Sequence, residues 1–324
     1  MLRYLARRAA NMLLLALLAT SGGYVLASAA LDPLVRFRGS NPPVPDEQVR
    51  RALALTGTDP DTPLAGRLGS WLAGLARGSL GTSVDNRPVT SEIAERAGTS
   101  LQLLVLGTVL GVGLGVLVGI VGAVRQHRWF DRVTTQGSFV VLATPTFVVA
   151  VLLMVGATRL NDATGRQIIR FTGQYTPGHD GWAGLADRAS HLLLPTVALT
   201  LGLVAVFSRY QRAALLDVLS TDLVRGARAM GHTQRSALVR HGVRVALVPM
   251  STLAVYTGGM VLAGATITEL TFSWHGMGEY LLLAARRGDV NAAAGTVACA
   301  AVLVLALGLV ADLLHAWLDP RVRL

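Results

Sequence analysis

Arginine and histidine gather in one segment, Asp222–Pro249, whose sequence DLVRGARAMGHTQRSALVRHGVRVALVP lies between two long apolar runs. Guanidinium and imidazole groups at this density bind anions, either the carboxylates of a protein partner or the phosphates of a lipid surface. A basic amphipathic helix lying on anionic lipid is the simpler interpretation from composition. A docking surface for a partner protein is the alternative, and the order of the residues has to decide between the two.

The local signals in this segment predict two helices separated by a glycine. Ser220 or Thr221 can cap the first helix, because a hydroxyl oxygen accepts a hydrogen bond from a free backbone N–H group. Gly231 suits the end of that helix, and Thr233 can cap the next one. Spacings of four and three residues place three apolar residues on one face: Leu223, Ala227 and Met230. We therefore expect a helix–glycine–helix element at a membrane surface.

The rest of the chain carries no motif typical of catalysis. It lacks the G-x-x-x-x-G-K-[ST] loop that holds ATP phosphates, so we do not expect this chain to hydrolyse ATP by itself. It also lacks an H-E-x-x-H motif, a Ser–His pair and paired aspartates at useful spacing, which argues against a membrane-embedded protease or transferase. Its one cysteine, Cys299, excludes an intramolecular disulfide and a multi-cysteine metal site. We expect no catalytic and no metal-binding residues.

The composition describes an integral membrane protein. Hydrophobic residues make up 52% of the 324 residues and charged residues only 15%, below the roughly 25% of soluble domains. Six stretches approach or exceed the length of about 20 apolar residues that crosses a bilayer. They are Ala9–Leu31, Ser100–Val124, Val133–Thr158, His191–Leu215, Val243–Thr271 and Asn291–Leu318. The first is longer than the core of a typical signal peptide, so we expect it to be retained.

The formal charge of +10 comes entirely from arginine and is unevenly distributed. The N-terminus, the alternate loops that share its side, the adjoining ends of their apolar stretches and the C-terminal tail hold 15 arginines beside 4 acidic residues. The positive-inside rule places these segments, and so both termini, in the cytoplasm. Topology therefore explains the charge, which leaves little reason to expect a nucleic-acid partner.

Glycines and prolines occur inside several of the apolar stretches. Glycine recurs at every fourth residue of the second stretch, at Gly107, Gly111, Gly115 and Gly119. This spacing places the four on one helix face, where another backbone can approach closely. A packing seam in a pore or against a partner, and ordinary packing within the chain, both stay open as interpretations. Pro145 and Pro195 fall in the third and fourth stretches, and each removes a helix hydrogen bond and favours a kink or break.

The residue order of Asp222–Pro249 resembles the cytoplasmic coupling loop, or EAA loop, of the permease subunits of bacterial ABC importers, in its peptide-permease form. The two parts read DLVRGARAMG and HGVRVALVP, where the family has approximately D-(Y/F)-(V/I)-R-T-A-R-A-K-G and H-x-(L/V)-R-x-A-L-(L/I)-P. The chain departs from this pattern at Leu223, Gly226 and Met230, where the family has an aromatic residue, threonine and lysine. The missing lysine removes one charge from the expected docking surface.

Further segments extend the resemblance over the whole chain: GSLGTSVDNRPV, ATPTFVVA, ELTFSWHGMGEYL and DPRVRL. Several are most similar to the B subunits of actinobacterial oligopeptide permeases. The resemblance implies an all-α fold of the ABC type I importer permease kind, with six transmembrane helices. It divides the chain into an N-terminal tail and first span (1–31), a small helical extracytoplasmic cap (32–99), a permease core (100–318) with its coupling loop (217–243), and a cytoplasmic tail (319–324).

The resemblance also implies a function. The chain would be the transmembrane permease subunit of an ATP-driven importer in the bacterial cytoplasmic membrane, forming half of the pathway for oligopeptides. Its partners would be a second homologous permease, two ATPase subunits or one fused ATPase, an extracytoplasmic peptide-binding protein and the bilayer. ATP and Mg²⁺ would bind the ATPase subunits, and this chain would hold no cofactor and catalyse no reaction. The same machinery importing dipeptides, nickel chelates or another small solute is the alternative, and a membrane-surface scaffold is a more remote one.

The same resemblance assigns residues to the contact with the ATPase subunits: Asp222, Arg225, Ala227, Arg228, Ala229, Gly231, Arg240 and His241. Ionisable residues inside membrane helices are further functional candidates, and these are His191, Glu269, Asp312 and His315. Their spacing indicates neither a proton relay nor a metal site. We expect hydrogen bonding between helices to be their role, and a part in transport stays open.

Overall fold

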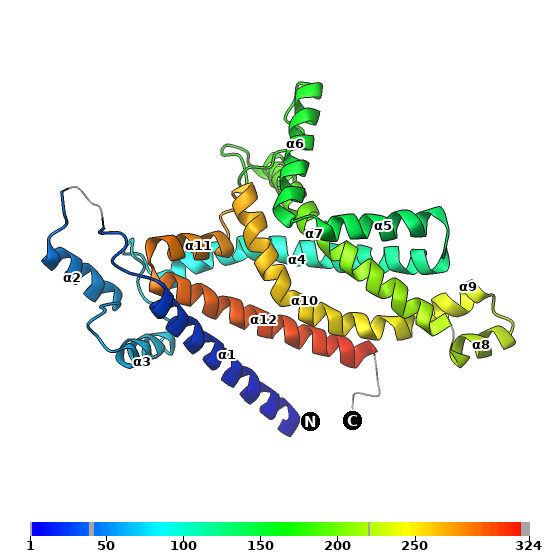
Figure 1. The fold of residues 1–324 in the computed structure, drawn as a ribbon, viewed down its shortest axis with the longest axis horizontal. Helices are drawn as coiled ribbons and strands as arrows, with labels where there is room; N and C mark the ends of the chain where they lie inside the picture. The colour runs from blue at the N-terminus through cyan, green and yellow to red at the C-terminus, as the bar shows by residue number, and fades with distance from the viewer. Residues whose placement is uncertain (1, 39–41, 220, 319–324) are drawn as a thin grey trace. The chain divides into compact units, whose positions relative to one another are not determined.

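The computed structural model describes residues 2–38, 42–219 and 221–318 of the chain. Within these ranges, the side chains of residues 2–7, 9, 234, 241, 255, 256, 258–260, 262, 263 and 311–318 are outside the description. The regular elements of the described residues are all helical, without a strand (Figure 1). The expectation of an all-α protein is therefore confirmed.

The helices follow one another in this order: α1 (Leu2–Ala30), α2 (Asp46–Thr56), α3 (Leu64–Leu75), α4 (Val89–Val124), α5 (Trp129–Ala143), α6 (Thr146–Thr164), α7 (Gly181–Leu219), α8 (Asp222–Ala229), α9 (Gln234–Ala237), the π-helix η1 (Leu238–Gly242), α10 (Val243–Phe272), α11 (Met277–Arg287) and α12 (Val290–Leu318). Among the described residues, helices long and apolar enough to cross a membrane are found in α1, α4, α6, α7 and α12. The predicted span Val243–Thr271 corresponds to the continuous helix α10, whose described stretch Val243–Ala254 is apolar. The chain is thus a multi-pass membrane protein, and the number of six spans stays a prediction.

The third apolar stretch forms two helices, where a single span over Val133–Thr158 was predicted. Helix α5 ends at Ala143 and α6 begins at Thr146. Thr144 is extended, with φ −95° and ψ 124°, because the ring of Pro145 disfavours a helical conformation in the residue before it. Pro195, in contrast, lies inside the unbroken helix α7. The two prolines therefore differ, because the chain breaks between two helices at Pro145 and stays helical through Pro195.

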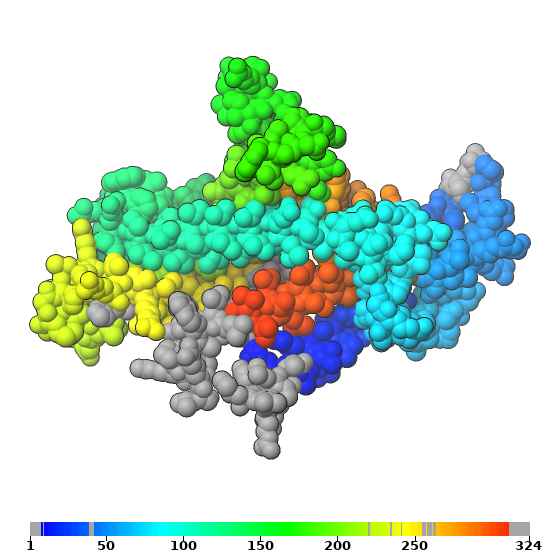
Figure 2. Space-filling view, turned by 180° about the vertical axis from the view of Figure 1, so that it is seen from behind, coloured from blue at the N-terminus to red at the C-terminus, as the bar shows by residue number. Residues whose placement is uncertain are grey.

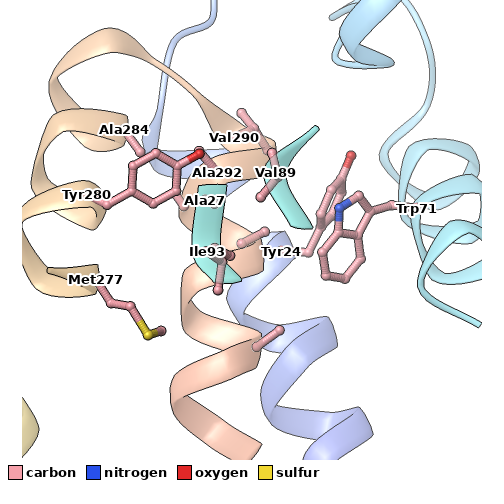
Figure 3. Packing of buried hydrophobic residues seen from close by; sticks show 13 residues of the cluster. Tyr24, Ala27, Trp71, Val89, Ile93, Met277, Tyr280, Ala284, Val290 and Ala292 are labelled. Carbon is pink, nitrogen blue, oxygen red and sulfur yellow. The ribbon is translucent and has the colours of Figure 1, made fainter. Parts of the chain in front are cut away.

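The contacts within the chain divide it into two compact units, and each is described separately. The first unit comprises residues 1–100 and 275–306. Its core is formed by α1, α3, α11 and the adjoining parts of α4 and α12, with Tyr24, Trp71, Val89, Ile93 and Tyr280 among the buried side chains (Figure 3). The rings of Tyr24 and Trp71 pack with their centroids 5.0 Å apart. The predicted helices of segment 32–99 are present as α2 and α3, whereas the extracytoplasmic position of this segment stays a prediction.

Polar side chains at the start of α12 hold the irregular segments of this first unit. Asn291 donates from Nδ2 to the carbonyl oxygens of Thr56 and Thr82, at 2.6 and 3.0 Å. Asp289 Oδ2 accepts the backbone N–H of Val84 at 2.7 Å. Burial raises the pKa of the Asp289 carboxyl group. These bonds satisfy backbone groups that no helix can pair, so the segment between α3 and α4 has a fixed path.

The second unit comprises residues 101–274 and the part of α12 from Leu307. Helix α7 is its central element, because it packs against α4, α5, α6 and α10. The glycines of the second apolar stretch face α7: a Cβ placed on Gly107 or Gly111 would lie 2.5 Å from the side chain of Leu199 or Leu203. Gly115 and Gly119 meet Phe207 and Ser208 in the same way. Of the two open interpretations of this glycine spacing, the structure shows packing within the chain.

Candidate functional site

The predicted helix–glycine–helix element is present between α7 and α10. Thr221 precedes α8 in an extended conformation, but its hydroxyl donates to the carbonyl oxygen of Val218 at 2.7 Å and does not cap the helix. Ser220, the other predicted cap, lies outside the described residues. After α8, Gly231 adopts φ +91°, a conformation that favours glycine. The N–H groups of Gly231 and His232 donate back to Arg228 and Ala227, which ends α8 where the sequence predicts.

The second half of the element differs from a regular helix. Thr233 Oγ1 accepts the backbone N–H of Ser236 at 3.3 Å, as predicted for a capping residue. Helix α9 lasts only to Ala237, and the next five residues form the π-helix η1, which continues into α10. Short π segments inside helices occur frequently at functional sites. The sequence does not predict this π-helix, because no residue pattern distinguishes it from a continuous helix.

The buried face of α8 differs from the predicted one. Val224 and Ala227 are buried, each 2% exposed, whereas Leu223 and Met230 are 46% and 74% exposed. Residue spacing alone permits α8 to bury either the face with Leu223 or the face with Val224. Packing against Leu215 and Val218 of α7 selects the face with Val224. Leu223 and Met230 therefore form an apolar surface that the second unit itself leaves uncovered.

One apolar cluster joins this element to three long helices. It contains Val224 and Ala227 of α8, Ala123 of α4, Leu215 and Val218 of α7, Ala237 and Leu238 of α9 and η1, and Ala246 of α10. Figure 2 shows α8 and α9 (yellow-green) beside the end of α4. Because close-packed side chains transmit displacement, a force on α8 acts on the ends of α4, α7 and α10 together.

The charged residues of the element lie on its open side. A concave surface of about 530 Å³ is lined by Arg225, Arg228, Ala229, Gly231, His232 and Thr233. Arg225 Nη1 lies 3.5 Å from Asp222 Oδ1. Both side chains are largely exposed, so this ion pair adds little stability. Arg240 is exposed as well, and the side chain of His241 lies outside the described residues. The structure thus places most of the predicted contact residues on or beside one cationic surface, with Ala227 beneath it, and their role in contacting a partner stays a prediction.

A partly buried ion pair between α5 and α7 is not predicted by the sequence. Arg212 of α7 donates from Nε and Nη2 to the carboxylate of Asp131 in α5, at 2.5 and 2.8 Å. The backbone N–H of His127 adds a third bond at 2.9 Å. The hydrogen bond from Arg212 is the main reason that the pKa of Asp131 is lowered. The presence of Arg212 inside an apolar stretch was the one signal in the sequence for such a pair. Its partner Asp131 is 81 residues away and could not be identified from local spacing.

Two of the other predicted candidates, His191 and Glu269, lie on α7 and α10, outside the element formed by α8, α9 and η1. His191 is buried on α7, with Nε2 3.2 Å from the hydroxyl of Thr176 and 3.7 Å from Asp187 Oδ1. Glu269 is buried in α10, and the side chains of Asp312 and His315 are outside the described part. Among the residues that the structure describes, no group of three or more His, Cys, Asp or Glu side chains is placed to hold a metal ion.

The family model for binding-protein-dependent transport system inner membrane components matches residues 111–324. The chain is 44% identical over 325 residues to the oligopeptide transport system permease protein OppB of Mycobacterium tuberculosis, an alignment that covers 100% of this chain and 99% of that protein. It is 32% identical over 280 residues to the glutathione transport system permease protein GsiC of Pectobacterium atrosepticum, covering 86% of this chain and 84% of that protein. Against the dipeptide transport system permease protein DppB of Escherichia coli it is 29% identical over 309 residues, covering 90% of each.

A solved structure shows a similar fold. The inward-facing MetNI methionine ABC transporter contains a chain that matches with a TM-score of 0.54 and 15% sequence identity. The match covers 70% of this chain and 96% of that chain. At this identity the similarity establishes the fold alone, which is that of an ABC importer permease.

Proposed function

The chain belongs to the family of binding-protein-dependent transport system inner membrane components, and from this we propose that it forms half of the membrane pathway of an ATP-driven importer of oligopeptides. The full-length similarity to an oligopeptide permease supports this cargo. Import of dipeptides or another small solute is the alternative, which the similarity to dipeptide and glutathione permeases favours.

The apolar cluster beneath α8 is the observation that carries the mechanism. The chain has no loop for ATP phosphates, so the energy has to enter from separate ATPase subunits, which would bind ATP and Mg²⁺. The uncovered residues Leu223 and Met230 offer those subunits an apolar contact, and the concave surface that Arg225 and Arg228 line offers them a charged one. Movement of α8 would then displace α4, α7 and α10 together and switch the pathway between its two access states.

Two further partners belong to this proposal. The family description supports a binding protein, which would deliver the peptide from outside the cell. A second, homologous permease would complete the pathway. The chain itself would catalyse no reaction and hold no cofactor. The distribution of arginines supports a position in the cytoplasmic membrane with both termini inside the cell.

Two glycines of the same element provide a matched test. A Cβ would meet nothing within 4 Å at either glycine. The two differ in conformation, because Gly226 lies within α8 and Gly231 has a positive φ. We expect G231V to insert into the membrane but to lose co-purification with the ATPase subunits or peptide uptake in reconstituted vesicles. G226A, which suits a helix, should retain both.

Two results would refute the proposed function. One is recovery of the chain as an active transporter without any ATPase subunit. The other is unchanged association and uptake in G231V, the outcome expected if the basic segment only binds lipid.

A further inference from the structure

Arg209 of α7 carries a positive charge that the coupling mechanism does not use. Its Cζ atom lies 4.1 Å from the centroid of the Phe139 ring on α5. This cation–π contact occupies one face of the planar guanidinium group, and the N–H donors point outward in the plane of that group. Arg212, one turn further along α7, is paired with Asp131. Arg209 forms no ion pair with any residue that the structure describes, so its charge is free to bind an anion.

Arg209 lines a groove of about 510 Å³ between α5 and α7. The other walls of the groove include Thr135, Phe139 and Leu142 of α5 and Val206, Tyr210 and Arg212 of α7. The side chains of Phe139, Leu142 and Tyr210 are exposed. The groove therefore opens on the outer face of this helix pair and not into the core of the second unit, which is where a membrane protein meets lipid or a partner subunit.

The charged and apolar residues follow an order along the groove. Helices α5 and α7 run antiparallel, because Asp131 near the start of α5 pairs with Arg212 towards the end of α7. The end of the groove at Arg212 is thus the end nearer the loop between α4 and α5, Arg209 comes next, and Leu142 and Val206 line the far end. That loop is among the segments that the positive-inside rule places in the cytoplasm. The groove is therefore charged towards the cytoplasmic side and apolar away from it.

We propose that this groove binds an anionic phospholipid, with the phosphate at Arg209 and an acyl chain along Leu142 and Val206. A phospholipid of the cytoplasmic leaflet has the same order, because its charged group lies at the surface and its chains extend inward. The phosphate oxygens accept hydrogen bonds from the planar donors of the guanidinium group. Basic pockets between membrane helices on the cytoplasmic side are typical sites for acidic head groups.

The order along the groove also separates lipid from the other occupants. An acidic residue of a partner subunit accounts for the charge of Arg209 alone and does not require an apolar end. A zwitterionic lipid carries its own cation and leaves the charge of Arg209 unbalanced. The bound anionic lipid joins α5 to α7 at their outer face, whichever cargo the transporter carries.

The first test measures the preference for the charged head group. The full-length chain is purified with its partner subunits, freed of lipid in detergent and titrated with phosphatidylglycerol or with phosphatidylcholine of the same chain length. Native mass spectrometry then counts the bound lipids. In R209M, which keeps an apolar side chain against Phe139, we expect the preference for phosphatidylglycerol to fall roughly tenfold, the effect of losing one charge-assisted hydrogen-bonded pair. R209K keeps the charge and loses the planar donors, so its preference should fall by only roughly threefold.

R125Q is the matched control, because Arg125 is an exposed arginine of the loop before α5 and lies outside the groove. Its preference should stay within roughly twofold of the wild type. An equal fall in R125Q and R209M would indicate attraction to the basic surface as a whole and would overturn the proposal. An unchanged preference in R209M would do the same. Displacement of phosphatidylglycerol by an equal concentration of glycerol phosphate would show a phosphate site without a chain site, which also contradicts lipid as the occupant.

The second test locates the lipid on the wild type and needs no variant. Phosphatidylglycerol with a photoactivatable group on one acyl chain is crosslinked to the purified complex, and the adducts are mapped by peptide mass spectrometry. We expect adducts at Leu142 and Val206 and their neighbours. Adducts confined to other faces would overturn the proposal. So would adducts at the groove that form on the isolated chain and disappear in the complex with the second permease, because a partner subunit then covers this face.

Discussion

The seam between α4 and α7 and the element formed by α8, α9 and η1 both depend on glycine, for different physical reasons. In the seam, a Cβ on Gly119 would lie 2.6 Å from the carbonyl oxygen of Ser208 and 3.0 Å from the backbone nitrogen of Arg212. At Gly231 a Cβ would meet nothing within 4 Å, and only the backbone angle requires glycine. Space is therefore the limit in the seam, and conformation is the limit in the element. The seam should govern stability, and the element should govern contact with a partner.

The ion pair beside the seam should show the largest effect on stability. D131N leaves Arg212 partly buried without its counter-charge, and breaking such a pair costs about 3 kcal/mol or more. The thermal unfolding midpoint of the purified protein measures this loss. D222N removes an exposed pair with Arg225 and should leave the midpoint nearly unchanged. Similar midpoints for D131N and D222N would contradict the comparison.

The pH dependence of stability checks the same pair. The pKa of Asp131 is lowered in the folded protein, so its stabilising contribution is complete above the unfolded pKa of about 4 and is lost as the pH falls below it. The wild type should therefore approach the stability of D131N in acid. A constant difference between the two proteins down to pH 3 would show that the carboxylate charge contributes nothing.

A methyl group in the seam should have the next largest effect. G119A places a Cβ against backbone atoms that cannot rotate away, and overpacking of this kind costs about 1–3 kcal/mol. G113A is the control on the same helix, because nothing lies within 4 Å of a Cβ there. Thermal unfolding of the two variants side by side tests whether the seam is as tightly packed as the contacts indicate.

G231A should destabilise the protein less, by about 1 kcal/mol, since an alanine at positive φ is strained but has room. The loss should appear as fraying of α8, measured by amide hydrogen exchange of residues 222–231. Unfolding of the whole protein should hardly change. A global loss as large as that of G119A would place the element in the stability core and remove the contrast.

The smallest change in stability is expected for the double variant L223A/M230A, whose side chains are exposed. Its unfolding midpoint should stay within about 0.5 kcal/mol of the wild type. Co-purification with the ATPase subunits should nevertheless fall, because the apolar part of the proposed contact is removed. Normal association of this variant would refute the assignment of that surface.

The sequence predicts those features that depend on neighbouring residues. The end of α8 at Gly231 follows from backbone preferences that act within a few residues. Helices α4 and α12 follow from apolar runs that need no partner to be recognised. The all-α fold and the membrane class could therefore be derived before the structure.

Features that depend on distant partners could not be predicted in this way. Whether α8 buries Val224 or Leu223 is decided by residues of α7 and α10. The pairing of Asp131 with Arg212 joins residues 81 positions apart. The contact residues of the coupling loop came from resemblance to a family, and their role awaits the experiments above.

The π-helix η1 has a consequence for comparing related chains. A π turn closes its hydrogen bonds over one residue more than an α turn, so η1 is equivalent to a single inserted residue in a continuous helix. Deleting one residue between Leu238 and Gly242 would restore the α-helical repeat, and because the wider π turn already takes up the extra residue, α9 and α10 would keep nearly the same relative rotation. Relatives with a one-residue gap here would therefore present the same face of α8 and α9, whereas a one-residue deletion inside α10 would turn that face by about 100°.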